Sequence, residues 1–254
     1  MSQPLLEAQG VRALYGDYVA LDGVSLAVDE GQFVSIVGPN GAGKTTLVNV
    51  LTGLLRPSTG TVRFKGENIA GIGPVKLAAL GMARSFQLVN IFPALTVAET
   101  IAVAVVSQHG RGFSWWTTLA RDRQVTERVA EVADLFGFAT KLGLPARTLS
   151  QGDKKLLDVA SAFALMPHII VLDEPTSGVS TRDKNTIMET LVGAAKRIGI
   201  KAIIQVEHDM DIVFSYSDRI VALHQGRILA DSTPEGIREN EQVVATVIGK
   251  THRP

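Results

Sequence analysis

The sequence has no cysteine among its 254 residues, and its formal net charge is zero, with 25 basic and 25 acidic side chains. Without cysteine the chain can form neither disulfides nor thiolate metal sites, and its composition fits a reducing compartment. A balanced charge gives no general argument for nucleic acid as a partner. Any anion site must therefore be local, built from backbone groups and a few side chains.

Long apolar runs are also missing. The longest candidate, residues 95–106, carries Glu99 and is shorter than the roughly 20 residues needed to span a bilayer. The N-terminus lacks a basic region followed by an apolar stretch, so no signal peptide is expected. With 46% apolar and 20% charged residues, we expect a soluble or peripheral protein with one large α/β domain and room for an inserted subdomain.

Short runs rich in β-branched residues alternate with helical patterns in both outer parts of the chain. We expect strands at 33–37, 61–65, 83–87, 168–172, 201–206 and 220–223, and helices at 44–55, 182–198 and 210–215, with Pro57 stopping the first helix. Between about 88 and 160 the strand signals give way to helices, expected at 96–106, 124–136 and 150–165. This order predicts a mostly parallel sheet covered on both faces, with a helical block inserted in it.

Residues 38–45 match the phosphate-loop pattern G-x-x-x-x-G-K-[ST] in full, between an expected strand and an expected helix. Glycines let the backbone wrap around phosphate oxygens, and the following helix adds its positive N-terminal end. Lys44 is expected to reach the β- and γ-phosphates, and Thr45 to hold Mg²⁺. The pattern predicts nucleotide binding but does not separate a kinase or a GTPase from a transport motor. The residues expected to contact the nucleotide are Gly38, Pro39, Asn40, Gly41, Ala42, Gly43, Lys44, Thr45 and Thr46.

Two acids follow the apolar run 169–172. At the carboxyl end of a parallel strand, Asp173 and Glu174 are expected beside the phosphate loop, where α/β sheets bind ligands. Asp173 is then placed to bind Mg²⁺, directly or through water, and Glu174 to orient and deprotonate an attacking water. An ordinary solvated strand end before Pro175 is the alternative, which the presence of the phosphate loop disfavours.

Residues 149–153, Leu-Ser-Gln-Gly-Asp, stand before an expected helix and upstream of these acids. They resemble the signature of the ATP-binding cassette (ABC) family, usually L-S-G-G-Q, and the resemblance covers nearly the whole chain. Within the family the chain is most similar to the uptake ATPases for branched-chain amino acids, on the strength of residues 82–87, 207–210 and 233–237. The similarity extends to single positions: Gln87 resembles the Q-loop glutamine, His208 the switch histidine, and Tyr15 the aromatic residue that stacks on adenine.

The resemblance implies an α/β phosphate-loop NTPase with a mostly parallel core sheet and an N-terminal antiparallel β part. The ATP-binding core is expected at 1–87 and 161–254, and the helical signature subdomain at 88–160. Gln87, Glu174 and His208 are implied as catalytic, with Gln87 also a ligand of Mg²⁺ beside Thr45 and Asp173. ATP and Mg²⁺ are the implied cofactors.

The resemblance also implies partners. Two cassettes, identical or related, would meet head to tail, with Ser150, Gln151 and Gly152 of one touching the ATP of the other. Transmembrane permease subunits would dock on residues 87–106, a solute-binding protein outside the cell would act indirectly, and the chain would lie on the cytoplasmic face of the plasma (inner) membrane. No nucleic acid is expected as a partner.

The chain departs from the family pattern at four positions. Gln151 replaces a glycine that varies among related uptake ATPases, and Leu156 replaces a common arginine. Asp153 replaces the usual glutamine and should repel a partner's phosphate unless Lys154 or Lys155 offsets its charge. Ser180 stands where aspartate is common. A soluble ABC ATPase without a transport role is the alternative function, but such proteins typically carry two cassettes or long coiled-coil insertions. A kinase or GTPase is disfavoured by the signature and by the absence of an N-K-x-D base-reading motif.

Overall fold

The structure is a computed structural model that describes residues 3–85, 92–108 and 122–248. The chain forms two compact units, the first made of residues 1–77 and 201–254 and the second of residues 78–200. Gln87 and the following residues 88–91 of the expected permease dock lie outside the described residues. The boundaries 87/88 and 160/161 that we expected between core and signature subdomain stay a prediction.

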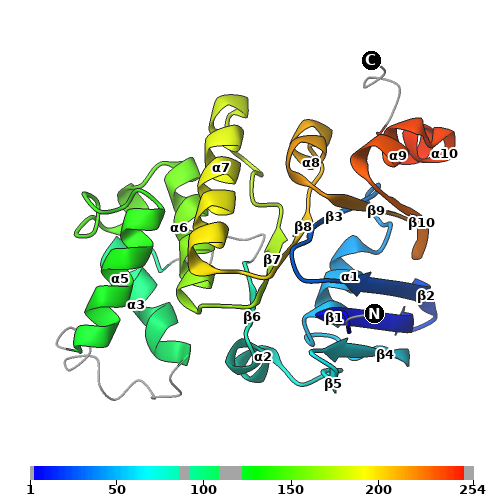
Figure 1. The fold of residues 1–254 in the computed structure, drawn as a ribbon, viewed down its shortest axis with the longest axis horizontal. Coiled ribbons are helices and arrows are strands. Elements are labelled where there is room, and N and C mark those ends of the chain that lie inside the picture. The colour runs from blue at the N-terminus through cyan, green and yellow to red at the C-terminus, as the bar shows by residue number, and fades with distance from the viewer. Residues whose placement is uncertain (1–2, 86–91, 109–121, 249–254) are drawn as a thin grey trace. The chain divides into compact units, whose positions relative to one another are not determined.

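One sheet of the first unit is antiparallel, in the order β2 (Tyr18–Val28), β1 (Leu6–Tyr15), β4 (Thr59–Phe64) and β5 (Glu67–Asn68). Figure 1 draws β1, β2 and β4 side by side in the blue and cyan part of the chain. Alternate residues of β1 are buried, as expected for strands with one face on a core. The expected N-terminal antiparallel β part is thus confirmed.

The first unit also holds parallel strands. The buried strand β3 (Phe33–Val37) lies between β8 (Ala202–Val206) and β9 (Arg219–His224), parallel to both, and β10 (Arg227–Ser232) pairs antiparallel with β9. All five residues of β3 and of β8 are buried, which is the pattern of strands covered on both faces.

Helices complete the first unit. They are α1 (Lys44–Leu51), α8 (Met210–Tyr216), α9 (Pro234–Glu239), α10 (Glu241–Val243) and the π-helical segment η3 (Val244–Ile248), while α2 (Pro74–Leu80) runs across the boundary between the units. A cluster of buried side chains joins α8, β9, α9 and α10: Val37, Met210, Val213, Ile220, Ala222, Ile237 and Val243. Arg238 of α9 lies over the ring of Phe214, 4.3 Å from its centroid.

The first helix is shorter than its sequence predicts. It ends at Leu51 rather than at residue 55, with Thr52 at its C-cap. Thr52 Oγ1 donates a hydrogen bond to the carbonyl oxygen of Val48 at 2.7 Å, and Gly53 then adopts a φ of +64°, which terminates a helix. The predicted stop at Pro57 was therefore wrong, because the Thr52–Gly53 pair ends the helix earlier.

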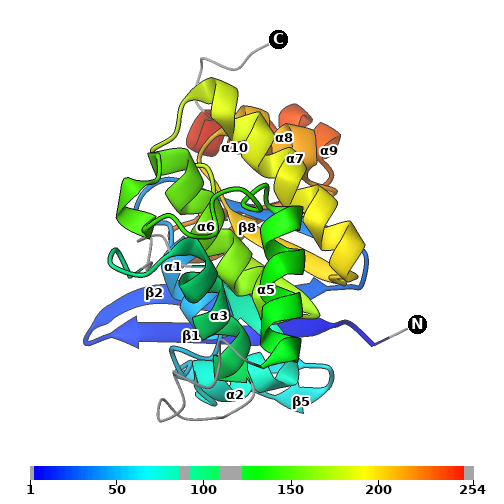
Figure 2. The same ribbon diagram turned by 90° about the vertical axis from the view of Figure 1, so that its left-hand side faces the viewer.

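The second unit combines two parallel strands with helices. β6 (Met82–Arg84) pairs with β7 (Ile169–Asp173), and the helices are α3 (Val97–Gln108), α5 (Arg123–Leu135), α6 (Gln151–Ala164) and α7 (Thr181–Ile198), with the short 3-10 turn η2 (Ala146–Thr148) before α6. Figure 2 shows α3, α5 and α6 gathered together. Phe136 and Phe163 meet edge to face in their core, with ring centroids 5.1 Å apart. The described part of residues 88–160 is helical, as predicted.

The fold class is confirmed: an α/β protein with mostly parallel strands in one sheet and a separate antiparallel sheet. Among the described residues, no helix is both long and apolar enough to cross a membrane.

Candidate functional site

The phosphate loop connects β3 to α1 within the first unit. Lys44 begins α1 and is 7% exposed, and its Nζ donates hydrogen bonds to the carbonyl oxygens of Gly38 at 2.7 Å and Pro39 at 3.0 Å. The ammonium group is thus held against its own loop. Thr45 is exposed and Thr46 is buried. A phosphate oxygen in this loop would meet a preformed positive charge.

At two positions of the loop the surrounding backbone leaves no room for any side chain, so only glycine fits. A Cβ atom at Gly38 would lie 2.3 Å from the carbonyl oxygen of Leu223, and one at Gly43 would lie 2.7 Å from that of Ala20. Gly43 also adopts a φ of +102°, which L-residues with side chains rarely reach. In addition, Gly226 N donates to the carbonyl oxygen of Ala42 at 3.0 Å. The loop is therefore shaped by tight contacts with β2 and the β9–β10 turn.

Tyr15 ends β1 in the same unit, opposite Tyr18, and is 51% exposed. Its strand pairs with β2, and β2 supplies the Ala20 carbonyl that contacts Gly43. An exposed aromatic ring on this hairpin is available for stacking on a base.

His208 follows β8 and is exposed. The buried Glu207 carboxylate accepts hydrogen bonds from the backbone N–H of His208 at 2.8 Å and of Asp209 at 3.4 Å. The Asp209 side chain in turn caps α8, accepting from Asp211 N and Ile212 N. Glu207 thus fixes the turn that carries His208. We used it only as a family marker in the sequence and missed this structural role.

Asp173 ends β7 in the second unit and is buried. Arg84 of β6 donates to its Oδ2 at 2.7 Å, and the two side chains are only 10% and 5% exposed. Glu174 follows with a φ of +50°, and Ser177 N donates to its carbonyl oxygen at 3.1 Å. A left-handed backbone is uncommon for glutamate, and such conformations cluster at functional sites.

The signature segment leads into α6. The Ser150 side chain is the N-cap and accepts from Asp153 N at 3.0 Å, while Gln151 is exposed. Gly152 has no left-handed φ, and a Cβ atom there would meet nothing nearer than Val179 Cγ1 at 3.9 Å. The packing of this chain therefore does not require a glycine at position 152, unlike positions 38 and 43.

Gln87 lies outside the described residues, so its role stays a prediction. Among the described residues, no cluster of three or more His, Cys, Asp or Glu side chains is placed to hold a metal ion.

The profile of the ABC transporter family matches residues 21–177, which include the phosphate loop, the signature and both acids. The chain belongs to the ABC transporter family. As a member, this cassette is a nucleotide-binding ATPase, and its Tyr15 and His208 lie outside the matched residues.

Curated relatives and a solved structure cover nearly the whole cassette. BraF of Pseudomonas aeruginosa, a high-affinity branched-chain amino acid transport ATP-binding protein, is 37% identical over 98% of this chain and 100% of its own. LivG of Escherichia coli, with the same description, is 34% identical over 98% and 100%. The ADP conformation of MJ1267, an ATP-binding cassette of an ABC transporter, is 28% identical with a TM-score of 0.80, covering 95% of this chain and 97% of that one.

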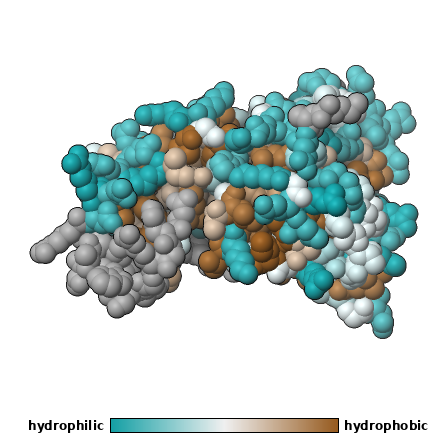
Figure 3. Space-filling view, turned by 60° about the horizontal axis from the view of Figure 1, so that its bottom comes forward, coloured by the Kyte–Doolittle hydropathy of each residue, from teal (hydrophilic) through white to brown (hydrophobic). Residues whose placement is uncertain are grey.

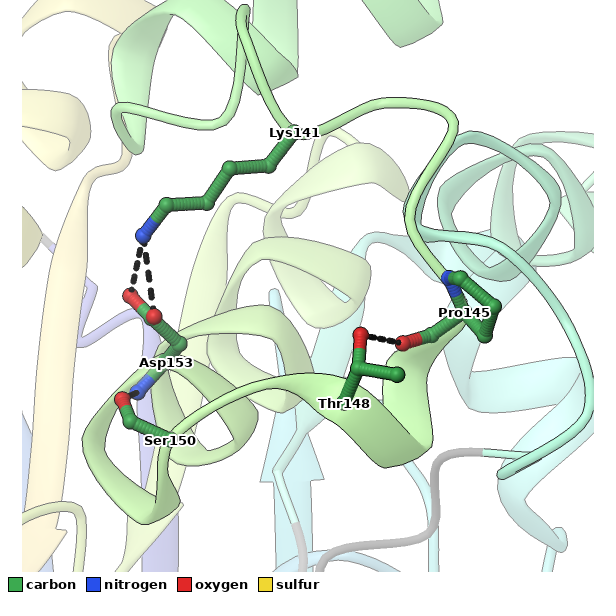
Figure 4. Close-up of polar contacts among 5 residues, drawn as sticks. All are labelled: Lys141, Pro145, Thr148, Ser150 and Asp153. Carbon is green, nitrogen blue, oxygen red and sulfur yellow. Dashed lines mark hydrogen bonds and ion pairs between the residues drawn. The ribbon is translucent and has the colours of Figure 1, made fainter.

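Two departures of this cassette from the family pattern, Asp153 and Ser180, have local explanations. Lys141 Nζ donates to both carboxylate oxygens of Asp153, at 3.0 and 2.9 Å (Figure 4). The sequence offered Lys154 and Lys155 as residues that could offset this charge, whereas the residue paired with Asp153 in the structure is Lys141. Ser180 is the N-cap of α7; its hydroxyl donates to Asp183 Oδ2 at 2.7 Å and accepts from Asp183 N at 3.3 Å.

Proposed function

We propose that this cassette hydrolyses ATP to drive an importer of branched-chain amino acids or related small solutes. The observation that carries the proposal is its similarity, over essentially the full length of both chains, to BraF and LivG, whose descriptions name branched-chain amino acid transport. No observation favours an ABC ATPase without a transport role.

The phosphate loop is the proposed ATP site. Gly41 leaves open space beside the loop, Lys44 supplies a positive charge, and α1 begins with Gly43 as N-cap, which has no side chain to occupy the first N–H groups of the helix. The exposed Tyr15 would stack on the adenine. The remaining contacts would be made mainly by the backbone N–H groups of Asn40, Gly41, Thr45 and Thr46. Pro39, which has no N–H, and Ala42, whose N–H donates to the carbonyl oxygen of Pro39 at 3.1 Å, would shape the loop.

Asp173 and Thr45 offer oxygen donors of the kind that Mg²⁺ prefers, and Gln87 offers an amide oxygen. We propose these three residues as its ligands beside the phosphates. When bound, Mg²⁺ would offset negative charge on the phosphate oxygens.

Glu174 is the proposed general base. Its carboxylate would orient and deprotonate the attacking water, while His208, held by the Glu207 turn, would contact the γ-phosphate. Gln87 would connect nucleotide chemistry to the helical subdomain.

The signature is proposed to act in trans in a head-to-tail pair of cassettes. Gly152 supports this role, because its own chain leaves open space where a side chain would stand. A closely approaching phosphate from a partner explains why the position carries glycine. Ser150 offers a hydroxyl at the same helix N-terminus, and Gln151 would flank it.

Permease subunits are the proposed membrane partners, which would hold the cassette on the cytoplasmic face, with a solute-binding protein acting indirectly. Figure 3 shows apolar surface between hydrophilic side chains on the face turned to the viewer. Phe92 lies within the expected dock at residues 87–106 and is 56% exposed. An exposed aromatic side chain there would give a protein partner an apolar contact.

Uptake of labelled leucine, isoleucine and valine by cells lacking the chain, with and without its gene restored, tests the proposal. Restored uptake is expected for wild type. Lys44→Ala should abolish both nucleotide binding and uptake. Glu174→Gln should keep nucleotide binding but lower turnover by about 10²–10⁴-fold, because it loses the base.

Glu189→Gln, which changes an exposed glutamate of α7, is the matched control and should behave as wild type. Uptake that does not depend on the chain would refute the importer proposal, and a fully active Glu174→Gln would refute the role of the base.

A further inference from the structure

The carboxylate of Asp153 favours the start of its own helix but disfavours the approach of a partner's phosphate. It lies in the first turn of α6, where a carboxylate stabilises the helix, and its N–H is already bonded to the Ser150 cap. The same turn presents Ser150 and Gly152, the groups proposed to meet a partner's phosphate. An unpaired carboxylate there would repel that phosphate.

Lys141 Nζ donates hydrogen bonds to both oxygens of this carboxylate, at 3.0 and 2.9 Å. It approaches from the segment between α5 and η2, twelve residues before Asp153 in the chain (Figure 4). The two side chains are 36% and 28% exposed, so bulk solvent screens the pair only in part.

The Lys141 side chain is itself held in place. The backbone N–H of Lys141 donates to the carbonyl oxygen of Phe138 at 2.8 Å, and Leu144 N donates to the carbonyl oxygen of Lys141 at 2.9 Å, so its backbone is held in a turn. Its ammonium lies 5.9 Å from the centroid of the buried Phe138 ring, within reach of a cation–π attraction. The segment that carries Lys141 therefore holds its ammonium group beside Asp153.

We propose that Lys141 is a positioning residue of the signature: it neutralises the Asp153 carboxylate and turns it toward its own subunit, so that a phosphate of the partner can approach Ser150 and Gly152. This inference rests on the proposed action of the signature in trans. It adds to the motif a residue that lies outside the five signature positions.

The test is a double-mutant cycle on the full-length chain, in the assembly in which wild type hydrolyses ATP. Lys141→Met removes the charge and keeps an aliphatic side chain. In the wild-type background it should lower turnover on the order of ten-fold, because one unpaired charge then faces the phosphate. In an Asp153→Asn background the same change should lower turnover by less than about two-fold, since no carboxylate is left to neutralise.

Two further measurements separate charge from structure. Nucleotide affinity of the single subunit should be unchanged in Lys141→Met, because its own phosphate loop is intact. Raising the salt concentration should recover part of the lost turnover, since salt screens a partly exposed charge but does not repair a misfolded segment. Lys141→Arg should stay near wild type because it keeps the ion pair.

Lys201→Met is the matched control, because Lys201 forms a comparable half-exposed ion pair with Glu30 at 2.7 Å in the first unit. It should turn over as wild type. If Lys141→Met does not fold, Lys141→Gln, which removes the charge and keeps a hydrogen-bond donor, is measured in its place with the same expected loss.

Equal turnover of wild type and Lys141→Met would overturn the inference. An equal loss in the wild-type and Asp153→Asn backgrounds would overturn it too, because Lys141 would then act on something other than the carboxylate. These results differ from a failure of the proposed function, in which wild type itself shows no turnover.

Discussion

The ion pair between Arg84 and Asp173 is buried on both sides and joins residues 89 positions apart. Breaking a buried pair by removing one partner is costly, because the remaining charge stays in a poorly solvating environment. Removal of Arg84 is therefore expected to destabilise the fold even without nucleotide. The same contact holds the carboxylate that we propose as a ligand of Mg²⁺.

Arg84→Met is therefore expected to lower the free energy of unfolding by about 3–5 kcal/mol at neutral pH, measured by urea denaturation. Arg123→Met is the matched control: it breaks a pair with Glu127 whose side chains are 90% and 62% exposed, and should cost at most about 0.5 kcal/mol. Equal denaturation midpoints for Arg84→Met and wild type would show that the buried pair contributes nothing.

Sequence reasoning at this scale found residues that lie in contiguous motifs and missed those that act through distant partners. The phosphate loop and the Asp173–Glu174 pair can be recognised because their chemistry needs neighbouring residues in a fixed order. Lys141 and Arg84 carry no such local pattern. Their roles follow from pairing with Asp153 and Asp173, which only the folded chain brings within hydrogen-bond distance.

At the scale of elements, the hydrophobic period predicts where strands and helices lie better than it predicts where they end. The buried strands β3, β7 and β8 lie within one residue of their predicted positions, because short β-branched runs leave little alternative. The end of α1 was missed because Thr52 and Gly53 stop the helix by a local cap, whereas proline was taken as the only stop signal.

The glycines of two elements are expected to respond differently to the same change. Gly43→Ala at the start of α1 should lower stability by about 1–3 kcal/mol or more, because the residue has a left-handed φ and its Cβ would press on the Ala20 carbonyl. Gly152→Ala in α6 should leave stability unchanged or raise it by up to about 1 kcal/mol, since alanine is the better helix former and the space is open.

Thermal and urea unfolding of the two variants, each beside wild type, measure this difference. A large loss of stability in Gly152→Ala would mean that the glycine serves the fold of its own chain, and would remove the main support for a role toward a partner.

At the scale of the whole molecule, the exposed side chain of Phe92, within residues 87–106, is expected to contact a permease. Phe92→Glu should fold normally, because surface substitutions usually change stability by no more than about 0.5 kcal/mol. It should keep the ATPase activity of the isolated cassette and lose solute uptake, since a charge would be buried at the contact. The readouts are phosphate release by purified protein and uptake by cells.

Met166→Glu is the control for this experiment, because Met166 is another exposed apolar residue of the second unit outside the proposed dock. It should leave uptake unchanged. Loss of folding in Phe92→Glu would instead indicate that the residue packs within its own subunit.

Head-to-tail pairing of cassettes predicts that two inactive variants restore each other. A pair of Lys44→Ala chains should be inactive, because both phosphate loops of the pair lack the lysine. Gly152→Asp should bind ATP yet turn over little, because an acidic side chain fills the space proposed for the partner's phosphate. In a mixed pair, one site combines the intact loop of the Gly152→Asp chain with the intact signature of the Lys44→Ala chain.

Random pairing in an equal mixture makes half of the dimers mixed, each with one competent site of two, so phosphate release should recover to about a quarter of wild type. Lys44→Ala mixed with Glu174→Gln is the control. Lys44 and Glu174 are proposed to serve the same ATP from the same chain, so each site of that mixed pair keeps one defect and turnover should not recover. A lack of recovery in the first mixture, with mixed dimers verified by differently tagged chains, would contradict a signature that acts across the pair. Recovery in both mixtures would instead contradict the assignment of Glu174 to the phosphate loop of its own chain.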